Sequence, residues 1–200
     1  MPPPSPRTQG WASTMGHGCI HIECFLDMMC PFSEKFWKSW ISEIWPEVKG
    51  SVKITVYHYC QPWHFQSSMA NMAAISVKQV SPDKYFEFLT NLFNKRAELT
   101  DQFVADMSYA DFLKDITPIA TSLGVPEDRF HPKMTLASAD HSDVMQEIKF
   151  HTKYGRQNGI HVTPSFMVNG IVDSSISSAW KMEEWKEHVD FIMGQKIPVA

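Results

Sequence analysis

The sequence of 200 residues contains no run of about 18 apolar residues, so we expect no transmembrane helix. It also lacks an excess of basic residues, because 18 Lys and Arg stand against 22 Asp and Glu and the formal net charge is −4. This balance gives no reason to expect nucleic acid or a membrane as a partner. Prolines at positions 2, 3, 4 and 6 replace the apolar stretch of a secretory signal peptide. We therefore expect a cytoplasmic protein with a disordered proline-rich leader over 1–17.

Cysteine is scarce as well. Four cysteines are too few to staple a secreted chain of this size with disulfides, and the sequence has no C-x-x-C pair. No histidine spacing places two ligands on one helical face, so we predict no metal site. The sequence does contain 44% hydrophobic and 20% charged residues, a composition typical of a globular protein with a sizeable core. The length fits one domain that carries an insertion.

One cysteine stands between a predicted strand and a predicted helix near the start of the chain. Residues 19–27 have the apolar pattern of a central strand, and a helical pattern then runs to about residue 45, where Pro46 should end it. Residues 52–58 alternate as a second, parallel strand. Cys30 thus lies at a helix N-terminus. The unpaired backbone N–H groups and the dipole there favour the thiolate, which is the reactive form of cysteine.

Helical patterns fill the middle of the chain, and a strand pattern returns near its end. Residues 68–158 predict four helices, the last two over roughly 109–123 and 140–157. Asn169-Gly170 then predicts a tight hairpin, followed by a closing helix over 182–193. The expected fold class is α/β, with the segments 18–67 and 159–200 sharing one sheet and 68–158 forming an inserted helical subdomain.

Four motifs resemble the DsbA-type branch of the thioredoxin superfamily over nearly the whole chain beyond residue 18. They are Phe25-Leu26-Asp27-Met28-Met29-Cys30-Pro31, Gln61-Pro62-Trp63-His64, Val162-Thr163-Pro164-Ser165-Phe166-Met167-Val168-Asn169-Gly170 and Ser178-Ala179-Trp180. The resemblance implies a thioredoxin-like fold, β-α-β plus β-hairpin-α, with the helical block inserted between the two parts.

The resemblance also implies roles for individual residues. Cys30 takes the place of the cysteine that attacks substrate thiols or disulfides, and Ser33 takes the place of the second, resolving cysteine. Ser33 cannot form a disulfide, but its hydroxyl is one helical turn away and can donate a hydrogen bond to the thiolate. Pro164 is implied to be cis and to face Cys30, which leaves the backbone of Thr163 to pair with an extended substrate.

Other polar residues fall near the same edge of the expected sheet. His58 and His64 are candidates for acid–base work, and each is equally consistent with a hydrogen-bonded structural role. Asp27 could accept the thiol proton or cap the adjacent turn. Cys60 could be a distant resolving thiol or a buried, inert one. The candidate substrate-binding residues are Pro31, Phe32, Trp63, Thr163 and Pro164.

These residues leave three functions open. The first is a thiol-dependent oxidoreductase or isomerase with a single nucleophilic cysteine, no tightly bound cofactor and glutathione as a possible co-substrate. The second is a non-redox isomerase or glutathione-transferase-like enzyme. Its small-molecule pocket would lie between sheet and helical block and be lined by Phe32, His58, Trp63 and His64. The third is an inactive module that binds an extended peptide. The partner is accordingly a small thiol or disulfide, or a peptide, and the oligomeric state stays open.

Overall fold

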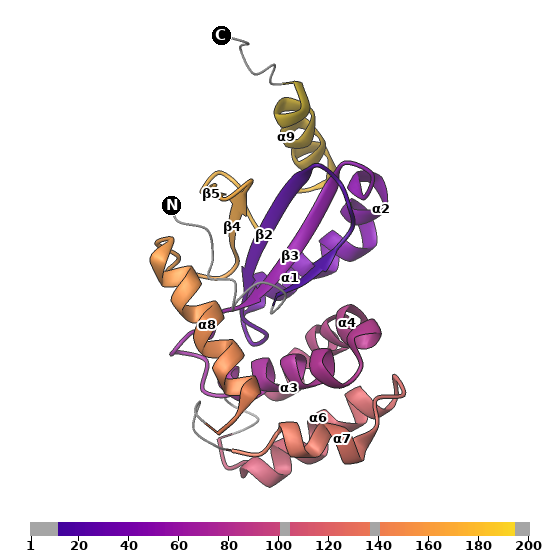
Figure 1. The fold of residues 1–200 in the computed structure, drawn as a ribbon, viewed down its shortest axis with the longest axis vertical. Helices are drawn as coiled ribbons and strands as arrows, with labels where there is room; N and C mark the ends of the chain where they lie inside the picture. The colour runs from indigo at the N-terminus through magenta and orange to yellow at the C-terminus, as the bar shows by residue number, and fades with distance from the viewer. Residues whose placement is uncertain (1–11, 101–104, 137–140, 195–200) are drawn as a thin grey trace.

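A five-stranded sheet forms the centre of the computed structural model, which describes residues 12–100, 105–136 and 141–194 (Figure 1). The strand order is β1-β3-β2-β4-β5, with β2 and β3 parallel and the other pairs antiparallel. The strands are β1 (Ser13–Met15), β2 (Ile20–Leu26), β3 (Val52–His58), β4 (Ser165–Val168) and β5 (Ile171–Val172).

The register of the strands brings three chain segments to one edge of the sheet. Leu26 at the end of β2 pairs with His58 at the end of β3, so both strands finish side by side. Phe25 pairs with Ser165 at the start of antiparallel β4, which brings the segment before β4 to the same edge. The residues after β2, after β3 and before β4 therefore meet there, as the β-α-β arrangement requires.

The first helix is longer than the sequence predicts. It consists of α1 (Pro31–Ser39), a π-helical turn η1 (Trp40–Ile44) and α2 (Trp45–Val48). The expectation that Pro46 ends the helix is wrong. The backbone N–H of Trp45 reaches back to the carbonyl of Trp40 in the wider π turn, so Pro46 enters at the start of a new α-helical segment, where its missing N–H is tolerated.

The helical block runs from Ser67 to Gln157 between β3 and β4. It comprises α3 (Ser67–Val80), η2 (Pro82–Lys84), α4 (Tyr85–Lys95), η3 (Arg96–Leu99), α6 (Tyr109–Thr121), α7 (Glu127–Lys133) and α8 (Asp143–Gln157). Figure 1 shows α3, α4, α6 and α7 together below the sheet, while α9 (Met182–Gly194) lies at the top. The short helix α7 has no counterpart in the sequence prediction.

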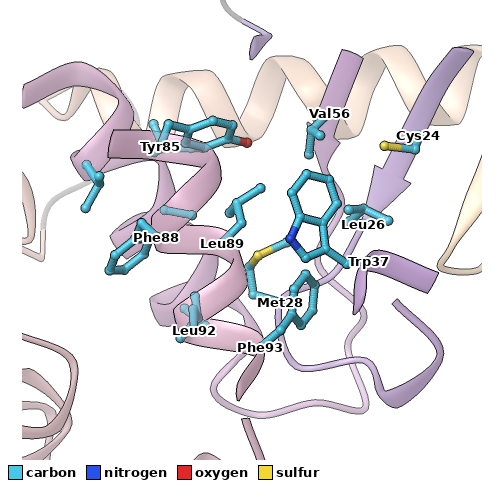
Figure 2. Packing of buried hydrophobic residues seen from close by; sticks show 14 of the residues in the cluster. Cys24, Leu26, Met28, Trp37, Val56, Tyr85, Phe88, Leu89, Leu92 and Phe93 are labelled. Carbon is cyan, nitrogen blue, oxygen red and sulfur yellow. The ribbon is translucent and has the colours of Figure 1, made fainter. Parts of the chain in front are cut away.

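The main core joins the sheet to this helical block. Figure 2 shows the indole of Trp37, from α1, among Leu26 and Val56 of the strands, Met28, and Leu89 and Phe93 of α4. The indole N–H also donates to Thr90 Oγ1 at 3.0 Å, so this buried polar group is satisfied. Packing of this kind fixes α4, and with it α3, against the sheet edge.

One part of the predicted leader is ordered. β1 lies within the segment 1–17 and pairs antiparallel with β3, from Ser13 opposite Val56 to Met15 opposite Ile54. The Thr14 and Thr55 hydroxyls lie 2.7 Å apart across this pair. The prediction of disorder is therefore wrong for Ser13–Met15, and residues 1–11 lie outside the described residues. The α/β fold with its inserted helical block is confirmed.

Candidate active site

Cys30 caps the N-terminus of α1 and is almost buried, with 4% of its surface exposed. Its extended backbone (φ −78°, ψ 124°) aims the residue across the open end of the helix. The thiol donates to the carbonyl oxygen of Thr163 at 3.2 Å, and the backbone N–H donates to the carbonyl of Asp27 at 3.1 Å. The position predicted for Cys30, at a helix N-terminus, is thus confirmed, and the thiol proton is held by a backbone carbonyl.

Thr163 and Pro164 form the opposite wall of the site. The peptide bond between them is cis, as the sequence resemblance implies. The Thr163 carbonyl is occupied by the Cys30 thiol, so the expectation that this backbone is open to a substrate holds only after that contact is released. The Thr163 hydroxyl is buried, and no partner for it occurs among the described residues.

Ser33 lies one turn into α1 and is fully buried. Its hydroxyl accepts a hydrogen bond from the backbone N–H of Asp27 at 3.3 Å. The expected hydrogen bond from Ser33 to Cys30 is not formed within the part of the chain that the structure describes. Ser33 instead ties the start of α1 to the end of β2, so it helps to set the position of the cysteine.

Asp27 is the centre of a hydrogen-bond network that the sequence did not predict. Its carboxylate is fully buried and accepts from five donors. These are the Met29 N–H at 2.9 Å, the Gln61 N–H at 2.9 Å, His64 Nδ1 at 2.9 Å, the Ser67 hydroxyl at 2.7 Å and the Asn71 amide at 3.4 Å. Five donors compensate the loss of water, as burial of a carboxylate demands. Asp27 therefore does more than cap a turn. It joins the loop after β3 and helix α3 to the segment between β2 and α1, residues 27–30, which we call the cysteine loop.

His64 is held by Asp27 through one ring nitrogen. Because a carboxylate only accepts hydrogen bonds, we assign the ring proton to Nδ1, which leaves Nε2 able to take up and release a proton. The side chain is partly exposed. His64 thus has the arrangement of an acid–base residue at the edge of the site.

His58 does not share this arrangement. It is buried, with Nδ1 2.7 Å from Asn71 Oδ1 and Nε2 2.8 Å from the Tyr85 hydroxyl. Burial lowers the pKa of His58 to about 4, although the hydrogen bond with Asn71 acts in the opposite direction. Both ring nitrogens are occupied, so the geometry favours the hydrogen-bonded structural role of His58 over the catalytic one.

Cys60 follows β3 near Asp27. Burial raises the pKa of its thiol to about 12, and the negative charge of Asp27 adds to this effect. All four cysteines of the described residues are free. A thiol that stays protonated at neutral pH is a poor attacking group, so the geometry favours the interpretation of Cys60 as an inert cysteine over a resolving one.

Exposed apolar side chains occur on the chain segments that meet at the cysteine end of the sheet. Phe32 at the start of α1 is 60% exposed and Trp63 is 57% exposed, so both of these candidate substrate-binding side chains are open to solvent. Two further members were missed: Phe65, at 83%, and Val162, at 57%. Val162 is the first residue of one sequence motif and Phe65 directly follows another, which was the available signal. We call Phe32, Trp63, Phe65 and Val162 the apolar rim. The exposed Pro31 stands beside it.

The small-molecule pocket expected between sheet and helical block is not assembled from its predicted residues. Phe32 and Trp63 lie on the surface, whereas His58 is enclosed by Asn71 and Tyr85. An open groove of about 570 Å³ does occur at the surface of the helical block, between α4, η3 and α6. Its lining residues include Asn91, Leu99 and Ile119, and none of the predicted site residues.

Comparison with known families decides the identity of the fold. The family described as Thioredoxin matches residues 19–190. The chain belongs to the thioredoxin family. No curated protein matches it. Within the described residues, no helix has the length and apolar character needed to cross a membrane.

Solved structures of other thioredoxin-like proteins superpose on this thioredoxin-family chain. A candidate protein-disulfide isomerase from Pseudomonas syringae is 25% identical, with a TM-score of 0.74, and the match covers 88% of this chain and 96% of that one. A thioredoxin-like oxidoreductase from Silicibacter pomeroyi has a TM-score of 0.69 at 17% identity, covering 94% and 95%. The thiol-disulfide exchange protein alpha-DsbA2 from Wolbachia pipientis has a TM-score of 0.69 at 18% identity, covering 90% and 87%.

Proposed function

We propose that the chain is a thiol–disulfide exchange enzyme that uses Cys30 as its single nucleophile. The observation that carries this proposal is the placement of the Cys30 thiol at the N-terminus of α1, against the Thr163 carbonyl before cis-Pro164. The similar solved structures include a candidate protein-disulfide isomerase and a thiol-disulfide exchange protein, which supports this class of reaction.

The reaction starts from the Cys30 thiolate. As the thiol releases its contact with Thr163 and loses its proton, the N-terminus of α1 stabilises the negative charge on sulfur. The thiolate attacks one sulfur of a substrate disulfide, so a bond forms between Cys30 and the substrate while the substrate S–S bond breaks. The second substrate sulfur leaves as a thiolate and takes up a proton.

His64 is the residue we assign to these proton transfers. Its Nδ1–H is fixed on Asp27, so Nε2 alternates between free and protonated states. It takes up the proton that leaves the thiol and returns one to the departing sulfur, either directly or through water. Asp27 itself keeps the ring oriented and stabilises the imidazolium form. Its carboxylate is fully occupied by donors.

Ser33 determines how the reaction ends. A second cysteine in this position would attack the mixed disulfide and release the substrate, but a hydroxyl cannot. An external thiol must do so: either another thiol of the same substrate, which gives isomerisation, or glutathione, which gives net exchange. In both cases the attacking thiol forms a new disulfide with the substrate sulfur, and Cys30 leaves as a thiolate. The proposed activity is therefore isomerisation and glutathione-linked exchange, without net dithiol oxidation.

The apolar rim favours a peptide over a small polar thiol as the substrate. Phe32, Trp63, Phe65 and Val162 expose apolar surface around a buried sulfur, which suits an extended chain with aliphatic or aromatic residues near its disulfide. Glutathione then acts as the external thiol in the second step. The cytoplasmic location expected from the sequence stays a prediction.

The test is the refolding of a protein with scrambled disulfides in a glutathione buffer. We expect recovery of the native protein to be faster with the wild-type chain than with buffer alone, and to return to the buffer rate with Cys30→Ser. Cys60→Ser should keep the wild-type rate, because that thiol stays protonated. Ser33→Cys, once its two active-site thiols have been oxidised to a disulfide by oxidised glutathione, should oxidise a reduced dithiol peptide while that disulfide is reduced, and we do not expect this reaction from the wild type.

Two results would contradict the proposal. If Cys30→Ser refolds the scrambled protein as well as the wild type does, Cys30 is not the nucleophile. If neither protein turns over substrate but both bind the peptide, the chain is a peptide-binding module. Alkylation of Cys30, followed by mass spectrometry of the modified peptide, shows in parallel whether the thiol is reactive at neutral pH.

A further inference from the structure

We propose that Gln61, supported by Tyr59, is a positioning residue that holds the Thr163 carbonyl against the Cys30 thiol and so controls how readily Cys30 loses its proton. This inference rests on the proposed role of Cys30 as the nucleophile. Among the described residues, neither Gln61 nor Tyr59 forms a hydrogen bond with the Cys30 sulfur. Both act through the segment that precedes cis-Pro164, which we call the proline segment (residues 160–163).

Two side chains from the segment just after β3 donate hydrogen bonds to consecutive backbone carbonyls of the proline segment. The Tyr59 hydroxyl donates to the carbonyl of Ile160 at 2.7 Å, and the Gln61 side-chain amide donates to the carbonyl of His161 at 3.3 Å. Both donors are buried. Two residues after the second carbonyl, Thr163 accepts the thiol proton of Cys30.

The same two residues are anchored to the cysteine loop through their backbones. The N–H of Tyr59 donates to the carbonyl of Leu26 at 2.8 Å, and the N–H of Gln61 donates to the Asp27 carboxylate at 2.9 Å. The backbone carbonyl of Asp27 in turn accepts the backbone N–H of Cys30 at 3.1 Å. The bonds thus form a closed circuit from Cys30 through Asp27 and Gln61 to the proline segment and back to the thiol.

Packing keeps one side of this circuit rigid. The ring of Tyr59 lies over Gly155 of α8 so closely that a Cβ at that position would stand 2.5 Å from its Cε2 atom. The ring also meets Phe25 edge-on, at 6.3 Å between centroids. Tyr59 therefore has no room to follow a moving proline segment, and Gln61 is the flexible member whose hydrogen bond sets the distance between Thr163 and Cys30.

The sign of the effect on Cys30 follows from the direction of its hydrogen bond. A carbonyl accepts a proton from the thiol but repels the thiolate, so the Thr163 contact stabilises the protonated form. Loss of the Gln61 amide loosens the proline segment and weakens this contact, which favours the thiolate. The titratable side chains on the segments next to Cys30 are Asp27 between β2 and α1, His64 and Cys60 in the loop after β3, His161 in the proline segment, and Glu34 and Lys35 on α1. The substitution alters none of them.

The experiment compares Gln61→Met with the wild type. Methionine has nearly the same size but no donor, and the backbone N–H to Asp27 remains. We expect the pH midpoint of Cys30 alkylation by iodoacetamide to fall by about half a unit to one unit, the size of one lost hydrogen bond. Disulfide exchange with a peptide should slow by about three- to tenfold, because Thr163 and Pro164, which we expect to orient the substrate, are displaced.

Matched variants separate positioning from general damage. Tyr59→Phe removes only the hydroxyl, which binds one residue further from Thr163, and should shift the midpoint in the same direction by less. Gln61→Asn keeps the amide on a shorter side chain and should give an intermediate midpoint. Gln79→Met removes an equivalent amide donor that binds Glu147 instead, and should leave the midpoint unchanged. Urea unfolding of each variant monitors the fold.

The outcomes distinguish this inference from the proposed function. An unchanged or higher midpoint in folded Gln61→Met overturns the positioning role, even if the wild type exchanges disulfides through Cys30. If Gln61→Met does not fold, an unchanged midpoint in Gln61→Asn and Tyr59→Phe overturns it. If the wild type shows no disulfide exchange that depends on Cys30, the proposed function fails. The alkylation midpoints still test the positioning role of Gln61.

Discussion

Two histidines occupy opposite ends of the Asp27 network, and only one of them is placed for chemistry. His64 lies in the loop after β3, binds Asp27 through one ring nitrogen and is partly exposed. His58, the last residue of β3, is linked to Asp27 through the amide of Asn71 and is buried with both nitrogens occupied. Both residues are histidines that lie close together in the sequence. The number of hydrogen-bond partners and the access of water to the ring therefore distinguish their roles.

The hydrogen-bond directions around His58 explain why it is fixed. The amide nitrogen of Asn71 faces Asp27 and the carbonyl of Ser67, so its oxygen faces His58 and requires a proton on Nδ1. Nε2 is then an acceptor and takes the hydroxyl proton of Tyr85. A second proton on the ring would oppose the Tyr85 hydroxyl and bring a charge into the core.

The largest effect we expect is a pH-dependent loss of stability at the His58 end. The pKa is lowered from 6.5 to about 4 in the folded protein, so the unfolded chain binds more protons between these values. Stability therefore falls as the pH drops from 6.5 towards 4, by about 3 kcal/mol from this residue. Urea unfolding of the wild type and of His58→Leu over pH 4 to 7 measures it.

The difference between the two proteins isolates the contribution of His58, since other titrating groups are common to both. His58→Leu should be less stable at pH 7, because Asn71 and Tyr85 lose a partner, yet it should lose less stability on acidification. Parallel curves for the wild type and His58→Leu would contradict the assignment of a neutral, buried ring.

Substitution of His64 should change the activity of the protein much more than its free energy of unfolding. His64→Gln keeps an amide donor for Asp27 but removes the nitrogen that exchanges protons. We expect disulfide exchange at neutral pH to slow by about a hundredfold, the lower end of what a general acid or base contributes. The measurement is the rate of scrambled-protein refolding against pH. The wild-type profile should contain a limb that the variant lacks, and an unchanged profile would remove His64 from the mechanism.

Local patterns in the sequence predicted the parts of the site that depend on neighbours in the chain. The position of Cys30 follows from a strand pattern that changes to a helical pattern at Pro31, and the hairpin follows from Asn169-Gly170. The resemblance to the DsbA-type branch supplied cis-Pro164. The three-residue strand β1 and the seven-residue helix α7 are too short to carry a periodic signal, and their contacts with distant parts of the chain stabilise them.

The Asp27 network could not be predicted in the same way. Its donors come from the cysteine loop, the loop after β3 and helix α3, and only folding brings them together. The same holds for the two histidines. His58 is enclosed because Tyr85 of α4 and Asn71 of α3 pack over the end of β3, and no local pattern contains that information.

The smallest effect we expect is at the apolar rim. Phe65 is 83% exposed, so its removal costs the folded state little, and Phe65→Ser should leave the free energy of unfolding within about 0.5 kcal/mol of the wild type. A peptide that covers the ring loses that contact, and we expect its KM to rise about threefold to tenfold with an unchanged kcat. Exchange with oxidised glutathione, which does not need the rim, serves as the control and should be unaffected. An equal loss with both substrates would mean that Phe65 acts on Cys30 itself, and no change with either would exclude the rim from substrate binding.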